Sequence, residues 1–534
     1  MARVPEYHFG PMEERAVTMD EAEIRIRPLD VPDDTFQNFG AAVQAVAASK
    51  PDAIAVIHEE SGTSWTWGHY ADRIARIASR LQAEGVGPNF MVTGLSENSA
   101  DYLALYCGVL HAGGCMVPLP FSARQDALQK MMSDCGSTLL FASDQFMDTA
   151  RTLGADTLVA ISDLDDWIGD AQPVPPADVQ PEHLYDMIYS SGTTGNPKGI
   201  IHDHLFRSRQ QVRASRNLLD GDSVILMSTP LYSNTTLVTS LAAQPKGTRT
   251  VIMSRFNTKE FLRLSETYRV THAMLVPVQY MRLMDEPDFD KYDLSAYICK
   301  MSTSAPLPGV VIEKVMARWP GNLIESYGMT EGGVSTSLDC AAFPDKWDTV
   351  GQVNPGGELK VIDENGVELP YGSFGEIVGR SGTMMPGYHN NPEKTAEATW
   401  TDPEGNIWIR TGDMGRMDAE GFLQLLDRKK DMIISGGFNI YAADLEFVLR
   451  KHPDVTDVAV IAVPSREWGE TPLALVVPRS PDADPEAIRT WANDQLGKTQ
   501  RVSKVEFRDD LPRSEIGKIL KRELREPYWE GASA

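Results

Sequence analysis

Residues 189–200 read Tyr189-Ser190-Ser191-Gly192-Thr193-Thr194-Gly195-Asn196-Pro197-Lys198-Gly199-Ile200, and an apolar lead-in precedes them. The stretch holds three glycines, four Ser or Thr hydroxyls and one lysine. Glycines let backbone N–H groups approach a ligand closely, hydroxyls donate short hydrogen bonds, and a lysine places positive charge near phosphate oxygens. The stretch therefore predicts a polyphosphate-binding loop. It does not follow the Walker A pattern, so a kinase or a P-loop ATPase is disfavoured.

The length and charge of the chain limit its class. With 534 residues it exceeds the size at which a single hydrophobic core stops growing, so we expect two or more domains. The formal net charge of -25 disfavours a nucleic-acid partner, whose phosphate backbone would be repelled. The five cysteines include no C-x-x-C pair, which suggests neither a disulfide framework nor a zinc site; a reducing cytoplasm fits best. No apolar run approaches the roughly 18 residues needed to span a bilayer, so we expect a soluble protein.

Short apolar runs alternate with helical patterns from about residue 36 onward. Residues 53–57 and 90–95 predict strands, and residues 70–81 between them carry apolar side chains at helical spacing. Similar apolar runs return at 138–141, 223–227, 250–253 and 272–276. This alternation predicts an α/β fold, with a large N-terminal domain of layered, mostly parallel sheets covered by helices.

The pattern of residue types changes twice in the last third of the chain. Residues 351–379 are rich in glycine and short β-type runs, which predict a small antiparallel sheet or barrel that closes the large domain. After residues 427–431 a compact unit begins, so we expect a large N-terminal domain over 1–429 and a small α+β C-terminal domain over 430–534. The expected elements of the small domain are strands at 432–434, 458–463 and 473–477, a helix at 442–451, and another helix capped by Asp484 and begun by Pro485.

The loop at 189–200 resembles the phosphate-binding motif of the adenylate-forming superfamily, which includes acyl-CoA synthetases, adenylation domains of peptide synthetases, and luciferases. Such enzymes activate a carboxylic acid with ATP as an acyl-adenylate, release pyrophosphate, and usually pass the acyl group to a thiol. Further segments resemble the superfamily's signatures in the expected order, from about residue 60 to residue 521. The resemblance assigns nucleotide binding to Ser190, Ser191, Gly192, Thr193, Thr194, Gly195 and Lys198.

Two further segments complete the expected nucleotide site. Residues 326–331 resemble the motif in which an aromatic residue, here Tyr327, lies against adenine, while Thr330 contacts phosphate and Glu331 helps to hold Mg²⁺. One carboxylate with phosphate oxygens and waters is a usual way to bind Mg²⁺. Ser326 is assigned to the nucleotide site and to the acyl pocket beside it. The resemblance also implies that Asp413 and Arg428 meet the ribose from opposite sides.

The resemblance implies that the C-terminal domain is mobile and carries a catalytic lysine. Lys430 matches the hinge, at which one residue absorbs a large change of backbone angles. Residues 511–518 match the loop that carries the catalytic lysine, here Lys518. Chemistry needs this charge because a carboxylate that attacks the α-phosphate brings two anions together.

The acyl pocket is expected from Tyr232, Ser233, Ser302, Ser304 and Ser326. Many acyl-CoA synthetases carry His at the place of Ser233. Loss of that ring could enlarge the pocket or supply hydroxyls for a polar substituent, or the hydroxyls could simply pack in the core; these alternatives stay open. We favour a bulky aromatic, alicyclic or steroid-derived acid over acetate.

For the thiol, the resemblance places Gly436, Gly437 and Trp468 along a pantetheine tunnel, and we expect free coenzyme A because no carrier-protein segment follows Lys518. The sequence thus predicts a cytoplasmic, ATP- and Mg²⁺-dependent acyl-CoA synthetase that acts on a small-molecule carboxylic acid; dimers occur among its relatives. The alternatives are a stand-alone adenylation enzyme that loads a carrier protein, a light-emitting oxygenase, and a non-catalytic nucleotide-binding regulator. The regulator is disfavoured because Lys518 accompanies the binding motifs.

Overall fold

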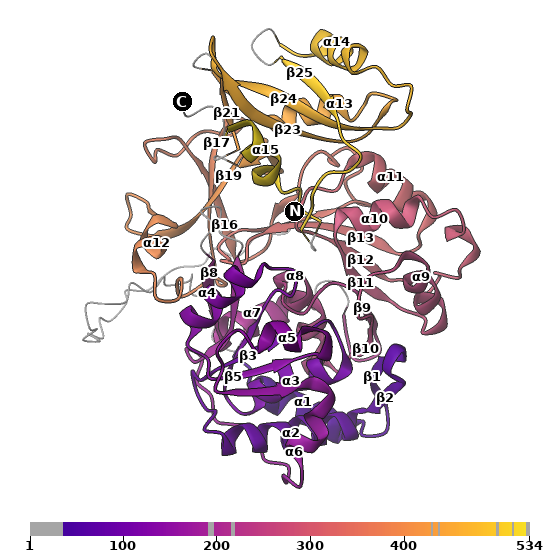
Figure 1. The fold of residues 1–534 in the computed structure, drawn as a ribbon, viewed down its shortest axis with the longest axis vertical. Coiled ribbons are helices and arrows are strands. Elements are labelled where there is room, and N and C mark those ends of the chain that lie inside the picture. The colour runs from indigo at the N-terminus through magenta and orange to yellow at the C-terminus, as the bar shows by residue number, and fades with distance from the viewer. Residues whose placement is uncertain are drawn as a thin grey trace, which may run out of the picture.

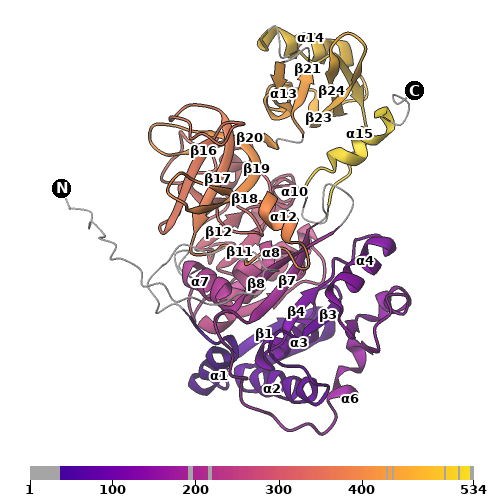
Figure 2. The same ribbon diagram turned by 90° about the vertical axis from the view of Figure 1, so that its left-hand side faces the viewer.

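The computed structural model describes residues 36–190, 197–214, 219–428, 431–435, 438–497, 501–514 and 517–529. Figures 1 and 2 show the N-terminal half of this chain, coloured indigo to magenta, at one end of the molecule. The C-terminal elements, coloured yellow, lie at the other end. A large and a small domain agree with the sequence prediction, although the predicted boundary at residues 429 and 430 falls outside the described residues.

The larger of the two sheets with mostly parallel strands has nine strands within the described residues, in the order β15-β14-β13-β12-β11-β9-β10-β1-β2. The strands from β13 to β1 along this order pair in parallel, while β14, β15 and β2 add antiparallel edges. The bounds are β1 Ile54–His58, β2 Thr63–Thr66, β9 Val224–Met227, β10 Arg249–Ile252, β11 His272–Leu275, β12 Cys299–Ser302, β13 Asn322–Gly328, β14 Ser335–Asp339 and β15 Gln352–Val353.

The second parallel layer has the order β6-β5-β3-β4-β7-β8. Only its last pair, β7 and β8, is antiparallel, and this pair encloses the glycine-rich stretch. The bounds are β3 Met91–Leu95, β4 Cys115–Pro118, β5 Leu139–Ala142, β6 Thr157–Ala160, β7 Leu184–Ser190 and β8 Lys198–Asp203. The prediction of open, mostly parallel sheets is confirmed.

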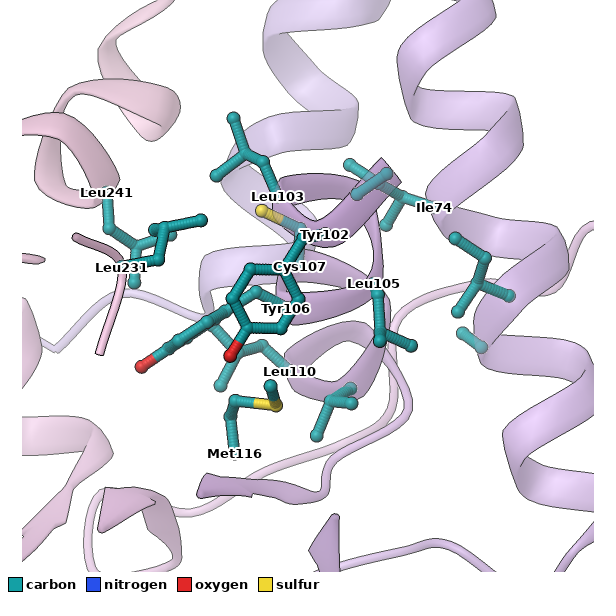
Figure 3. Close-up of a cluster of buried hydrophobic side chains, with 14 of the residues drawn as sticks. Ile74, Tyr102, Leu103, Leu105, Tyr106, Cys107, Leu110, Met116, Leu231 and Leu241 are labelled. Carbon is teal, nitrogen blue, oxygen red and sulfur yellow. The ribbon is translucent and has the colours of Figure 1, made fainter. Parts of the chain in front are cut away.

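Helices cover both layers because their apolar faces need a sheet or another helix to pack on. Figure 3 shows one such core, in which Ile74 of α2 faces the side chains of α3, with Leu231 and Leu241 on the far side. Ser99 caps α3 by accepting a hydrogen bond from the N–H of Tyr102 at 3.0 Å. The main helices of the large domain are α1 Phe39–Ser49, α2 Trp67–Ala83, α3 Ala100–His111, α4 Gln125–Cys135, α5 Met147–Ala150, α6 Leu164–Ile168, α7 His204–Ala214, α8 Asn234–Thr236, α9 Thr258–Thr267, α10 Pro277–Met284, α11 Gly309–Arg318 and α12 Pro392–Glu397.

An antiparallel sheet follows, as the glycine-rich pattern predicted. Strands β16, β17, β19 and β18 pair in that order, and β20 pairs with β19. Their bounds are β16 Gly357–Ile362, β17 Gly375–Ser381, β18 Thr399–Thr401, β19 Ile407–Met417 and β20 Leu423–Arg428.

The C-terminal domain has its own sheet and its own hydrophobic core. Its elements are β21 Ile433–Ser435, β22 Phe438–Ile440, α13 Ala442–Leu449, β23 Val455–Ser465, β24 Gly469–Pro478, α14 Pro485–Gln495, β25 Lys504–Phe507 and α15 Lys521–Trp529. Helix α13 ends at Leu449, short of the predicted Lys451. Asp484 caps α14, and Pro485 is its first residue, as predicted. Of the helices that the structure describes, none is both long and apolar enough to cross a membrane.

Candidate active site

The predicted site segments gather at one edge of the nine-stranded sheet. Strands β9, β11, β12 and β13 run parallel, so their carboxyl ends meet at the same edge. The residues that follow these strands include Ser233, Val276, Ser304 and Thr330. The N–H of Thr303 donates to the carbonyl of Leu275 at 3.3 Å, which ties two of these segments together. Ligands of open α/β sheets bind at such carboxyl edges.

The glycine-rich stretch is closed at its base by a strand pair. Ser190, the last residue of β7, is the register partner of Lys198, the first residue of β8. Residues Ser191, Gly192, Thr193, Thr194 and Gly195 between them lie outside the described residues. The ammonium of Lys198 lies 4.9 Å from the ring centroid of Tyr388, at cation–π distance.

Two side chains outside the predicted motifs hold the segment that contains Thr330 and Glu331. The Nε2 of His202 lies 2.7 Å from the carbonyl oxygen of Thr330. The hydroxyl of Tyr388 donates to Oε1 of Glu331 at 2.9 Å. The main chain of Glu331 is fixed as well, because its carbonyl accepts from the N–H of Met385 at 2.9 Å.

His202 belongs to a buried charged network. Asp186 accepts from Arg207 at 2.8 Å and from Tyr106 at 3.0 Å, and it lies 2.6 Å from Nδ1 of His202. Burial alone would raise the pKa of Asp186, but Arg207 and His202 outweigh burial and hold this pKa at about 2. The carboxylate therefore stays ionised and anchors the strand pair β7–β8 beneath Thr330.

The structure brings together the predicted adenine and ribose residues. The hydroxyl of Tyr327 donates to Oδ2 of Asp413 at 2.7 Å, although 86 positions separate the two residues. Arg428 is the register partner of Asp413 across β19 and β20. Ser326 precedes Tyr327 on β13 and is half-buried. Four predicted nucleotide residues therefore lie on neighbouring strands, Ser326 and Tyr327 on β13 and Asp413 and Arg428 on the β19–β20 pair.

Around the predicted acyl pocket, hydroxyls form local bonds. Ser233 is buried and caps α8, because its Oγ accepts from the N–H of Thr235 at 3.3 Å. The Oγ1 of Thr235 lies 2.8 Å from Oγ of Ser304, so these two hydroxyls join α8 to the segment after β12. Ser304 adopts φ 80°, a left-handed conformation that costs a non-glycine residue about 1 kcal/mol or more.

Two further predicted acyl-pocket residues, Tyr232 and Ser302, have different surroundings. Tyr232 is half-buried; its hydroxyl lies 3.3 Å from Oγ of Ser122, and its ring meets the ring of Phe121 edge-on at 5.2 Å. Ser302, at the end of β12, is completely buried beside its register partner Glu325. Ser302 is thus placed beneath the carboxyl edge, whereas Tyr232 lies nearer the surface.

The loop that carries Lys518 contacts the large domain. The N–H of Ser514 donates to the carbonyl of Lys518 at 2.9 Å, which ties these two described residues of the loop together. Gly517, at φ 74°, lies so close to α10 that an added Cβ would be 2.7 Å from Cγ1 of Val278 and 3.5 Å from Cγ2 of Val276. Since Val276 follows β11, the contact brings the Lys518 loop to the carboxyl edge, and the Lys518 side chain is exposed there.

The remaining predicted residues are only partly described. Trp468 lies in the turn between β23 and β24 with 51% of its surface exposed. Lys430, Gly436 and Gly437 lie outside the described residues.

Sequence reasoning missed Tyr388 and His202, and it missed the pairing of Thr235 with Ser304. Tyr388 lies 57 positions from Glu331 and His202 lies 128 positions from Thr330, so no local spacing reveals these contacts. The pairing of Thr235 with Ser304 likewise spans 69 positions.

Comparison with known proteins agrees with this arrangement. Residues 43–389 match the AMP-binding enzyme family, and residues 444–518 match the AMP-binding enzyme C-terminal domain. A feruloyl-CoA synthase of an Amycolatopsis species is 32% identical over 497 residues, which cover 92% of this chain and 99% of that protein. The fatty acid–[acyl-carrier-protein] ligase ScoC of Streptomyces coeruleorubidus is 31% identical over 501 residues, 90% of this chain and 95% of ScoC. ATP-bound MatB from Rhodopseudomonas palustris superposes with a TM-score of 0.84 at 27% identity, over 92% of this chain and 98% of MatB.

The fold, the edge site and these matches define an enzyme of the AMP-forming acid–thiol ligase class. The chain belongs to the AMP-binding enzyme family, as its sequence motifs predicted.

Proposed function

We propose that the protein is an ATP-dependent acyl-CoA synthetase with free coenzyme A as its thiol acceptor. The observation that carries the proposal is the contact of Gly517 with Val278. This contact supports a catalytic role for Lys518, because it brings the loop of that lysine to the edge at which Tyr327 and Asp413 meet.

In the first step, a carboxylate oxygen of the acid attacks the α-phosphorus of ATP, and pyrophosphate leaves. Lys518 offsets the repulsion between the two anions as charge builds on the phosphate. In the second step, the thiol sulfur attacks the acyl carbonyl; the thiol proton is released, and AMP leaves with the oxygen that came from the acid. Asp413 and Arg428 hold the ribose, Tyr327 lies against adenine, and the residues 190–198 bind phosphate.

The donors at this site fit a Mg²⁺ ion that the protein and the bound nucleotide would hold together. Among the residues that the structure describes, no group of three or more His, Cys, Asp or Glu side chains could hold a metal ion. Glu331 is a single half-buried carboxylate with one oxygen engaged by Tyr388. Such a donor set suits Mg²⁺ that takes its other ligands from phosphate oxygens and waters. The ion would then neutralise charge on the triphosphate, with Glu331 as its protein ligand and Thr330 beside it.

For the acid, we propose a bulky aromatic, alicyclic or steroid-derived substrate held by Tyr232, Ser233, Ser302, Ser304 and Ser326. The similarity to a feruloyl-CoA synthase, an enzyme named for a product with an aromatic acyl group, supports the aromatic class. For the thiol, Gly436, Gly437 and Trp468 would line the pantetheine path. The similarity to ScoC supports a carrier protein as the second candidate acceptor.

The small domain would turn about Lys430 between the two steps, with the domain boundary at residues 429 and 430. We place the enzyme in the cytoplasm. A homodimer is one candidate for its oligomeric state.

The test is ATP–pyrophosphate exchange over a panel of aromatic, alicyclic, steroid-derived and short-chain acids. The exchanging acid is then incubated with CoA, or with a carrier protein that bears a pantetheine arm, and the products are analysed by mass spectrometry. We expect an acyl-CoA thioester and AMP. If exchange occurs but the thioester forms only on the carrier protein, the acceptor is the carrier protein and not CoA. If no acid supports exchange, adenylation is contradicted.

A further inference from the structure

Residues 384–389, which include Tyr388, pair with both segments that are predicted to bind phosphate. Tyr388 forms an antiparallel bridge with Ile200 of β8, and Met384 forms one with Gly332. On the first side, the N–H of His389 donates to the carbonyl of Gly199 at 2.8 Å. The segment thus fixes the residue after Lys198 on one side and the residue after Glu331 on the other.

The side chain of Tyr388 contacts the functional group of each neighbour. Its hydroxyl donates to Oε1 of Glu331 at 2.9 Å, and the ammonium of Lys198 lies 4.9 Å from its ring centroid. One aromatic side chain therefore meets both a carboxylate and an ammonium that face the phosphates in the proposed function.

The surroundings of Tyr388 make it a rigid support. Its side chain is 8% exposed and packs with Ile200, Met385 and Ile409, while its N–H donates to Oγ1 of Thr395 at 3.0 Å. The ring, the hydroxyl and the main chain of Tyr388 are therefore each held by a partner.

We propose that Tyr388 is a positioning residue, which sets the distance between the metal-binding carboxylate of Glu331 and the phosphate-binding ammonium of Lys198. Because Tyr388 donates to Oε1 of Glu331, this hydrogen bond would orient the carboxylate and leave Oε2 as the oxygen for the metal. The inference rests on the proposed function, because it takes Glu331 as a ligand of Mg²⁺. Outer partners of this kind typically contribute about 10- to 100-fold to metal affinity.

The decisive variant is Tyr388→Phe, which keeps the ring beneath Lys198 and deletes only the donor to Glu331. The full-length protein is titrated with ATP by calorimetry, once with Mg²⁺ and once with EDTA. We expect the affinity for ATP in Mg²⁺ to fall about tenfold, while the affinity in EDTA stays unchanged, since only the metal ligand is disturbed. ATP–pyrophosphate exchange should then need a higher Mg²⁺ concentration for half-maximal rate.

Tyr268→Phe is the matched control. The hydroxyl of Tyr268 also donates to a carboxylate, that of Glu59, but at the end of α9 away from the site. The control should match wild type in both titrations. Tyr388→Leu, which also removes the ring, should lower the affinity for ATP in EDTA as well, because Lys198 loses its aromatic support.

Equal losses for Tyr388→Phe in Mg²⁺ and in EDTA, or no loss in Mg²⁺, would overturn the positioning role. A different result would contradict the proposed function, namely a wild-type protein that shows no pyrophosphate exchange with any acid. If Tyr388→Leu does not fold, Tyr388→Phe still decides the question.

Discussion

Gly517→Ala tests the docking of the Lys518 loop. The added methyl would lie 2.7 Å from Cγ1 of Val278, whereas carbon atoms in contact prefer about 3.5–4.0 Å. Overpacking of this kind costs about 1–3 kcal/mol, and a β-branched valine has few rotamers with which to relieve it. At about 1.4 kcal/mol per factor of ten, the equilibrium constant for docking should fall roughly 5- to 150-fold.

The assay separates the two half-reactions. Pyrophosphate exchange needs the docked loop and should fall by up to that factor, whereas transfer of acyl from a supplied acyl-adenylate to CoA should be preserved. Gly405→Ala is the control for backbone strain alone, because Gly405 has φ 84° but nothing within 4 Å of an added Cβ.

A second substitution makes the reasoning refutable. Val278 is only partly buried, so Val278→Ala removes the clashing methyl at little expense of stability. The double variant Gly517→Ala, Val278→Ala should regain most of the exchange that Gly517→Ala loses. Wild-type exchange in the single variant, or no recovery in the double variant, would show that this contact does not control adenylation.

Three further changes have defined outcomes. Lys518→Ala should slow pyrophosphate exchange about 100- to 1,000-fold and spare transfer from acyl-adenylate, while Lys504→Ala, on the same domain, should leave both rates unchanged; equal rates for the two variants would refute the role of Lys518. Lys430→Pro should leave exchange largely intact and slow thioester formation, and equal loss of both would refute the hinge. Burial raises the pKa of Glu325 from its ordinary 4.5 to about 7, so the folded state loses stability as pH rises through that window. Glu325→Gln should remove this loss, so that thermal unfolding shows a gain over wild type at pH 8 and none at pH 5; a gain of equal size at both pH values would contradict the assignment.

Much of the fold could be predicted because local patterns specify it. Apolar runs such as 223–227 and 272–276 are continuous, as expected of strands buried on both faces, and they became β9 and β11. The order of the strands could not be predicted in this way. β10 follows β9 in sequence, yet β9 lies between β10 and β11, and this arrangement depends on packing between distant segments.

Many residues of the site could likewise be predicted from local motifs, whereas most contacts between them could not. Tyr327 and Asp413 could be named one by one from short motifs, but their contact across 86 positions depends on the meeting of two sheets. Tyr388 carries no motif that points to Glu331, so its role emerges only from the folded chain. The hydroxyl of Ser233 illustrates the opposite case, since a residue predicted for the acyl pocket also caps a helix.

The most direct test of the account follows the oxygen atoms of the acid. An exchanging acid with ¹⁸O in its carboxylate is incubated with ATP and CoA, and the products are weighed by mass spectrometry. If a carboxylate oxygen attacks the α-phosphorus, each AMP carries one ¹⁸O and the pyrophosphate carries none. Unlabelled AMP, or label in the pyrophosphate, would contradict the acyl-adenylate on which the whole account depends.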